Sequence, residues 1–252
     1  MKVVLTYHSI DESGSVISAS RAAFTRQMEW LARGGVKVVP LSAIASCTGV
    51  DDAVALTFDD GYRNFAETAL PVLLHHGLPA TVFIVSRRVA GKNDWDREAV
   101  EIPKLPLMSW DELGRCVELG VDLGGHGRTH RVLTGMESDE LQDEIEGCSE
   151  DITRGVGLRP LTFAYPYGLW DEASRDAVSR SFDVACTTDL RPLARSDHSA
   201  AIPRIDSRYL TGVGRIEAFG QLRFAAYIRI RRAVRNFRIA SIGRLRPSPG
   251  VR

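Results

Sequence analysis

The sequence predicts an α/β fold, in which a mainly parallel sheet forms a distorted (β/α) barrel of seven or eight strands covered by helices. Apolar, β-branched runs alternate with stretches whose apolar residues recur at helical spacing. Clusters of polar residues directly follow several of the expected strands, as they do at the carboxyl ends of barrel strands. The length of 252 residues also suits a single α/β barrel.

Four strands are expected in the first half of the chain, at residues 2–7, 36–39, 53–58 and 80–85. Helices are expected around residues 24–32 and 65–76, because apolar residues recur there three or four positions apart. Gly34-Gly35 and Gly77 end these two helices, and a brief helix follows residues 40–42.

The second half opens with the irregular residues 86–108, a length typical of a functional loop. Ser109 is expected to be the N-cap of the next helix. Further helices are expected at residues 141–152 and from about Asp171. Strands are expected at residues 121–123, 161–165, 183–186 and 201–205.

The composition is that of a soluble globular protein, with 44% apolar and 25% charged residues. The cysteines are far apart and form no C-x-x-C pair, so we expect buried free thiols in a reducing compartment; they are Cys47, Cys116, Cys148 and Cys186. The first apolar run is too short for a signal peptide, and no segment reaches the roughly 18 apolar residues of a membrane span. We therefore expect a cytoplasmic protein.

The net charge of zero hides an uneven distribution. Residues 214–252 hold ten Arg and one Glu, which leaves 22 basic and 31 acidic residues in the rest. We therefore divide the chain into a barrel, residues 1–210, and a basic C-terminal helix and tail, residues 211–252. An apolar stripe runs along that helix, formed by Phe219, Leu222, Ala226, Ile230, Ala233 and Phe237. It fits attachment to an anionic membrane surface or acidic partner, or packing on the acidic barrel. No feature reads bases, so nucleic acid is not expected as a partner.

Two adjacent carboxylates, Asp59 and Asp60, follow the expected strand 53–58 and precede Gly61. Successive side chains of a strand point to opposite sides, so the two cannot act alike unless the chain bends, which Gly61 permits. Two carboxylates at one strand end suit a division between binding a metal and moving a proton. An ordinary Asp-Asp-Gly turn is the alternative.

His126 and His130 are four residues apart in a Gly-rich stretch after the expected strand 121–123. One helical turn or a tight loop can aim both imidazoles at one point. Two His and one Asp suit a first-row divalent ion and leave coordination positions open, as a catalytic site requires. The alternative is a pair of surface histidines.

Three motifs together resemble the polysaccharide deacetylases with a NodB-type domain, carbohydrate esterase family 4. They are Thr57-Phe58-Asp59-Asp60-Gly61, His126-x-x-x-His130 and Tyr165-Pro166-Tyr167-Gly168, and the resemblance covers roughly residues 2–210. It implies a NodB-type barrel in which Asp59 is the general base. Asp60, His126 and His130 would bind the metal, and the backbone N–H of Tyr167 would help to hold the oxyanion.

Two positions depart from the family pattern. The Arg that often tethers the base two residues before the Pro of the third motif is Ala164 here, and we expect Arg204 to supply the guanidinium. No L-x-H strand near the C-terminus supplies the general acid. The first strand ends in His8, so we expect a circularly permuted barrel with His8 as the acid and His198 as the alternative.

The resemblance implies metal-dependent hydrolysis of N-acetyl groups on an amino-sugar polymer or glycoconjugate, with release of acetate. It is nearest to the branch that acts on poly-N-acetylglucosamine-type exopolysaccharides. We expect Zn²⁺, with Co²⁺, Ni²⁺, Fe²⁺ or Mn²⁺ as alternatives, and sugar contacts from Tyr165, Pro166 and Trp170. A weakly active glycan-binding protein and a hydrolase of a non-sugar amide remain alternatives. The basic helix would allow a peripheral position at the inner membrane surface.

Overall fold

The computed structural model describes residues 1–45, 52–95 and 102–245 of the chain, and side chains up to residue 238. Its main sheet is entirely parallel, and its strands follow the order β10-β1-β5-β6-β7-β8-β9, with β4 paired to β5. The strands are β1 (Lys2–Tyr7), β4 (Lys37–Val38), β5 (Ala53–Phe58), β6 (Thr81–Ile84), β7 (Asp122–Gly125), β8 (Thr162–Ala164), β9 (Val184–Cys186) and β10 (Ile205–Asp206). A separate two-stranded sheet joins β2 (Ser9–Ile10) to β3 (Ser18–Ala19).

The sheet curls until its two ends come together. Ile202, three residues before β10, forms a parallel bridge with Cys186 of β9, while β10 itself pairs with β1. The strands and their curvature confirm the predicted distorted barrel. The first strand, β1, lies between β10 and β5, which is the place that a permuted barrel requires. The permutation itself stays a prediction.

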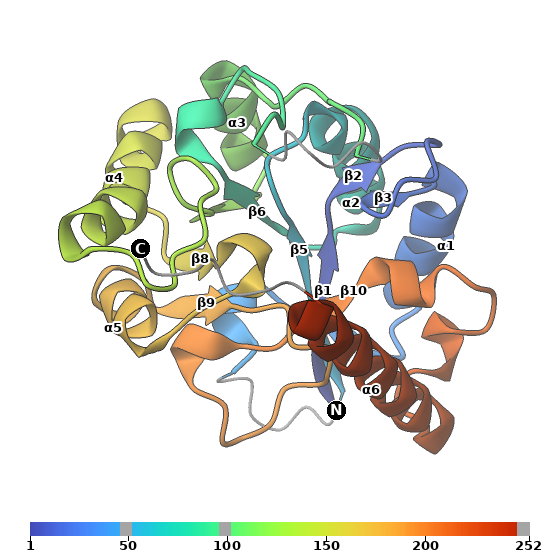
Figure 1. Cartoon of the computed structure of the whole chain (residues 1–252). Coiled ribbons are helices and arrows are strands. Elements are labelled where there is room, and N and C mark those ends of the chain that lie inside the picture. Colours follow the sequence, from blue (N-terminus) through green and yellow to red (C-terminus); the bar gives the residue numbers. More distant parts are fainter. Residues whose placement is uncertain (46–51, 96–101, 246–252) are drawn as a thin grey trace.

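Helices surround the sheet, as Figure 1 shows. The α-helices are α1 (Arg21–Ala32), α2 (Leu70–His76), α3 (Trp110–Glu118), α4 (Ser138–Val156), α5 (Glu172–Ser181) and α6 (Leu222–Leu245). Short helical turns lie between them, at η1 (Leu41–Ala43), η2 (Phe65–Ala69), η3 (Ser86–Arg88), η4 (Pro166–Gly168), η5 (Ser199–Ala201), η6 (Ser207–Leu210) and η7 (Ile216–Ala218). Ser109 caps α3 through a capping box with Glu112, as predicted. No described helix meets the length and hydropathy needed to cross a membrane.

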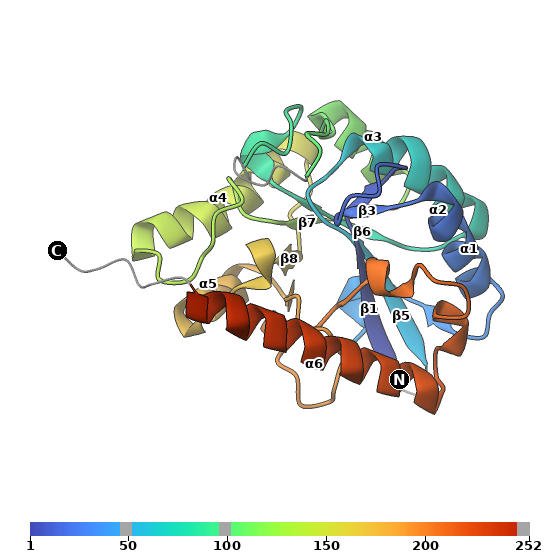
Figure 2. The ribbon, with the colours of Figure 1, turned by 45° about the vertical axis from the view of Figure 1, so that its right-hand side comes forward.

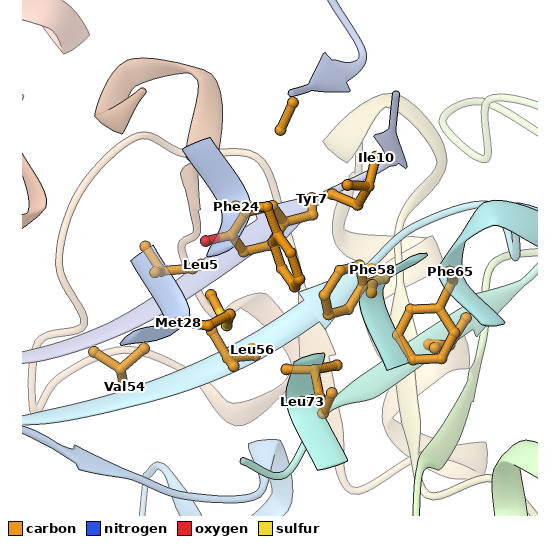
Figure 3. Close-up of a cluster of buried hydrophobic side chains, with 14 of the residues drawn as sticks. Leu5, Tyr7, Ile10, Phe24, Met28, Val54, Leu56, Phe58, Phe65 and Leu73 are labelled. Atoms are coloured by element: carbon orange, nitrogen blue, oxygen red, sulfur yellow. The ribbon is translucent and has the colours of Figure 1, made fainter. Parts of the chain in front are cut away.

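Alternation along β1 and β5 divides the core into two layers. Tyr7 and Phe58 point outward and join an aromatic cluster with Phe24 and Phe65 beneath α1 and η2, which Figure 3 shows. Val4 and Ala55, with partners from β6, β8 and β9, belong to a second buried cluster. Two apolar layers hold β5 rigidly, so the residues that follow its carboxyl end start from a fixed position.

Several boundaries differ from those predicted. β7 extends through Gly124 and Gly125, where a Cβ at Gly124 would lie 2.5 Å from the Phe83 ring, so glycine is required by close packing. The strand expected at 201–205 begins only at Ile205, because η5 occupies Ser199–Ala201. Cys116, Cys148 and Cys186 are buried free thiols, whereas Cys47 lies outside the described residues.

The apolar stripe expected on the C-terminal helix is, apart from Phe219, not the face that packs on the barrel, and its attachment to a membrane surface or acidic partner stays a prediction. Phe224 and Ile228 are buried in the main core, and Phe219, just before α6, packs against Trp30. The other stripe residues are exposed, Leu222 by 91% and Ile230 by 63%. Apolar spacing alone could not distinguish two faces that both carry apolar residues. Figure 2 shows α6, in red, as a long helix along the edge of the molecule.

Candidate active site

The barrel brings the predicted polar residues together at the carboxyl ends of its strands. His8 follows β1, Asp59 and Asp60 follow β5, and His126 follows β7. Because parallel strands end on one face of a barrel, residues far apart in sequence become neighbours there. The outcome is a compact group of buried charges rather than a set of separate turns.

The chain turns sharply between the two carboxylates. Asp59 continues the alternation of β5, on the same side as Ala55 and Thr57, while Asp60 adopts φ of 72° and Gly61 φ of 74°. A left-handed conformation is uncommon for a non-glycine residue and is found where a site requires it. The bend predicted at Gly61 therefore begins at Asp60 itself and gives the two carboxylates different surroundings.

Asp60, His126 and His130 form a buried group whose ligand atoms all lie within 4.8 Å of one another. Asp60 Oδ1 is 3.5 Å from Nε2 of each histidine and has no hydrogen-bond partner among the described residues. His126 Nδ1 donates to the carbonyl of Ala164 at 2.6 Å, which leaves the lone pair on Nε2, facing Asp60. A buried carboxylate oxygen without a hydrogen-bond partner and two imidazole nitrogens that converge on it suit a cation, so these residues fit a divalent metal ion.

Burial governs the protonation of this group. It raises the pKa of Asp60, an effect that the positive charges of His8 and His126 oppose. Burial also lowers the pKa of His130 well below its ordinary value, and the neighbouring His126 lowers it further. A neutral imidazole is the form that binds a metal, so desolvation favours the ligand state of His130.

The loop between the two histidines is held by Glu144, a buried residue of α4. One carboxylate oxygen, Oε2, accepts the backbone N–H of Arg128 at 2.8 Å and of Thr129 at 3.0 Å, and the other accepts the Thr129 hydroxyl. The loop needs this support because Gly127 and His130 both have positive φ. Sequence reasoning missed Glu144, although a Glu beside Ile145 on the buried face of α4 was a usable signal.

The carboxylate of Asp59 is held by Arg204. The guanidinium donates to both oxygens, at 2.6 and 2.7 Å, and its Nε donates to the carbonyl of Thr187 at 3.0 Å. Arg204 is 1% exposed and directly precedes β10, and its guanidinium binds Asp59 as expected from the missing arginine at Ala164. Burial alone would raise the pKa of Asp59, but the charges of Arg204, His126 and His8 outweigh it and lower that pKa.

The two candidate acids lie in different surroundings. Nε2 of His8 is 3.8 Å from Asp59 Oδ2, and the side chain is 24% exposed, so His8 joins the site at its open edge. His198 instead caps η5, where its Nδ1 accepts the N–H of Ala200 at 3.1 Å. His8 therefore lies where a group bound beside Asp59 could contact it, while the His198 ring is engaged as a cap.

The third motif contributes differently from the prediction. The ring of Tyr165 is fully buried and its hydroxyl donates to the carbonyl of Ala200 at 2.9 Å, which is the environment of a core residue. Pro166 is also buried, whereas Trp170 is 40% exposed. Tyr167, with φ of 60°, lies edge-on against His130 with 4.6 Å between ring centroids. Trp95 lies against the same imidazole with 4.7 Å between ring centroids, so two aromatic rings flank His130.

Comparison with known proteins places this geometry in a family. The family model described as polysaccharide deacetylase matches residues 48–181, which is more than half of the chain. A chitooligosaccharide deacetylase from Bradyrhizobium is 31% identical over 165 residues, covering 64% of this chain and 66% of the relative. A poly-β-1,6-N-acetyl-D-glucosamine N-deacetylase from Staphylococcus aureus is 22% identical over 195 residues, covering 75% and 67%. The chain thus spans about two thirds of the length of these relatives.

A solved structure supports the fold independently. IcaB from Ammonifex degensii superposes with a TM-score of 0.69 and 20% identity, covering 90% of this chain and 96% of that one. At this identity the likeness bears on the fold alone. The coverage extends beyond residues 48–181, so the matched barrel includes strands outside the family model.

Proposed function

This chain belongs to the polysaccharide deacetylase family, and on that premise we propose that it hydrolyses N-acetyl groups of an amino-sugar polymer or glycoconjugate. The products would be acetate and a free amine. The observation that carries the proposal is that the two buried carboxylates, Asp59 and Asp60, have chemically different partners. Asp59 is bound by a guanidinium, and Asp60 faces two imidazoles with an unpartnered oxygen.

Asp60, His126 and His130 would hold a divalent ion, and we propose Zn²⁺, with Co²⁺, Ni²⁺, Fe²⁺ or Mn²⁺ as substitutes. Such an ion, when bound, acidifies a water molecule and polarises the acetyl carbonyl. Three protein ligands leave positions for both. Ala164 contributes indirectly, since its carbonyl fixes the tautomer and orientation of His126.

Asp59 would accept the proton of the attacking water. The lowered pKa keeps its carboxylate ionised, and the two hydrogen bonds from Arg204 fix its orientation. A carboxylate of low pKa is a weak base, so it suits only a water that is already acidic. The general base and the metal group therefore depend on each other in this site.

The departing amine must leave protonated, because an amide anion is a poor leaving group. We assign that proton to His8, whose imidazole lies at the open edge beside Asp59. The backbone N–H of Tyr167 would donate to the oxyanion that forms at the acetyl carbon. Tyr167 and Trp170, which are 42% and 40% exposed, supply aromatic surface for the sugar at the rim.

The names of the relatives indicate a substrate class. The S. aureus relative is named a poly-β-1,6-N-acetyl-D-glucosamine N-deacetylase, which names a polymer of N-acetylglucosamine, and the Bradyrhizobium relative is named a chitooligosaccharide deacetylase. We propose an exopolysaccharide of this kind as the substrate. The proposed catalytic residues would bind the acetamido group, and the aromatic side chains at the rim, Tyr167 and Trp170, would contact the sugar ring.

Acetate release is the direct test. Pure protein is incubated with oligomers of β-1,6- and β-1,4-linked N-acetylglucosamine, with and without a chelator, and with Zn²⁺ or Co²⁺ restored afterwards. We expect release that the chelator abolishes and the metal restores. Binding of the oligomers without any release by metal-loaded protein would show a glycan-binding protein instead.

A further inference from the structure

Helix α6 presents an apolar face to the outside of the molecule. Its outer stripe consists of Leu222, Ala226, Ile230, Ala233 and Phe237. These residues are spaced three or four positions apart, so they share one face of the helix. The large ones are 91%, 63% and 75% exposed, which is unusual for three apolar side chains in one row.

The opposite face of α6 fastens the helix to the barrel. Phe224 and Ile228 are 1% exposed, and Arg232 donates twice to Asp189, at 3.0 and 2.9 Å. Arg235 donates to the carbonyl and hydroxyl of Thr188. These contacts hold the helix with Leu222 and Ile230 directed away from the body, so packing among the described residues does not account for these two exposed side chains.

The charge beside the stripe has one sign. Residues 218–252 contain nine Arg and no acidic residue. At 3.6 residues per turn, Arg223 and Arg229 lie about 60° to either side of the middle of the outer stripe. Both are exposed, and no ion pair forms to either within the described residues. An apolar row edged by arginines allows the apolar side chains to enter a lipid surface while the guanidinium groups meet the headgroup phosphates.

We propose that α6 docks the protein on an anionic lipid surface, with the outer stripe among the acyl chains and its flanking arginines at lipid phosphates. A second copy is disfavoured, since pairing two stripes would bring arginines together without acidic partners. A polyanion such as nucleic acid would use the arginines but leave the apolar row in water. The inference concerns a surface distinct from the proposed catalytic site and stands without it.

Vesicle co-sedimentation of the full chain tests the proposal. Vesicles of phosphatidylcholine alone are compared with vesicles that also contain phosphatidylglycerol, at low and at high salt. We expect binding to the anionic vesicles, weakened by roughly fivefold in Arg229→Gln and by about tenfold or more in Leu222→Gln/Ile230→Gln. Leu158→Gln and Arg195→Gln, exposed residues outside α6, serve as matched controls and should bind like wild type.

Thermal unfolding of each variant checks that the fold is retained, since the changed side chains are exposed. No binding to anionic vesicles would overturn the proposal. Binding that salt weakens but the double variant does not would also overturn it, because a purely electrostatic contact does not use the outer stripe. A dimer that the double variant converts to monomer, without vesicle binding, would show that a second copy covers the stripe.

Discussion

Asp59 and Asp60 are adjacent in the chain and equally buried, yet their surroundings differ in kind. Asp59 has a full complement of donors from Arg204, and its pKa is lowered. Asp60 faces two imidazoles with an oxygen that no described residue contacts by a hydrogen bond, and its pKa is raised. The left-handed turn at Asp60 separates them. Asp59 finds its partner within the protein, whereas the surroundings of Asp60 fit a cation.

Removing the guanidinium should have the largest effect on the Asp59 side. Arg204→Met leaves a buried carboxylate unpaired, which costs about 3–5 kcal/mol in the free energy of unfolding. We expect acetate release to fall by roughly a hundredfold or more, because the base loses its orientation. Arg232→Met removes an arginine from a similar two-bond pair at the surface and should cost about 1 kcal/mol or less.

The pH dependence of stability distinguishes the pair from simple packing. The lowered pKa means that the Asp59–Arg204 pair stabilises the native state above the ordinary pKa of Asp, and that this stability is lost as pH falls through the native value. Denaturant unfolding in the presence of a chelator should therefore show a wild-type advantage over Arg204→Met that is greatest near neutral pH and smaller in acid. A difference in unfolding free energy between wild type and Arg204→Met that does not change with pH would show that Arg204 stabilises the protein by packing and not through its charge.

The general acid should come next in size of effect. His8→Gln is expected to lower kcat by about a hundredfold with a much smaller effect on metal affinity, since the carboxylate paired with His8 is Asp59 and His8 is not one of the three proposed metal ligands. His198→Gln is the matched control, because its ring caps η5. Full activity in His8→Gln would exclude His8 as the general acid. Loss of activity in His198→Gln would instead assign that role to His198.

Substitution of Glu144 should have the smallest effect of these changes, and it should act only on the group formed by Asp60, His126 and His130. Glu144→Gln keeps the volume but removes the charge that binds the Arg128 and Thr129 amides. We expect zinc affinity to fall by roughly tenfold, the low end for residues that orient ligands. Glu150→Gln, exposed on the same helix, should leave affinity unchanged. Unchanged affinity in Glu144→Gln would show that the loop keeps its shape without it.

The site residues that lie in short sequence motifs could be predicted from the sequence, whereas those that depend on contacts between distant parts of the chain were harder to predict or were missed. Asp59, Asp60, His126 and His130 lie in two short motifs, and strand alternation together with barrel topology was enough to predict that they lie close together.

Arg204 lies 145 residues from Asp59 in the sequence, and only the absence of an arginine at Ala164 pointed to it. Tyr165 was expected from its motif to contact the sugar, yet its ring is buried in the core. Glu144 and the packing face of α6 depend on tertiary contacts that no local pattern records.

The two carboxylates can be compared directly by measuring zinc affinity in Asp59→Asn and Asp60→Asn, by competition with a chromophoric chelator. We predict that Asp60→Asn weakens binding by on the order of a hundredfold or more, the loss expected when one of three ligands is removed. Asp59→Asn should bind zinc about as tightly as wild type while releasing little acetate. Equal losses of affinity in the two variants, or a larger loss in Asp59→Asn, would contradict the division of roles between these neighbours.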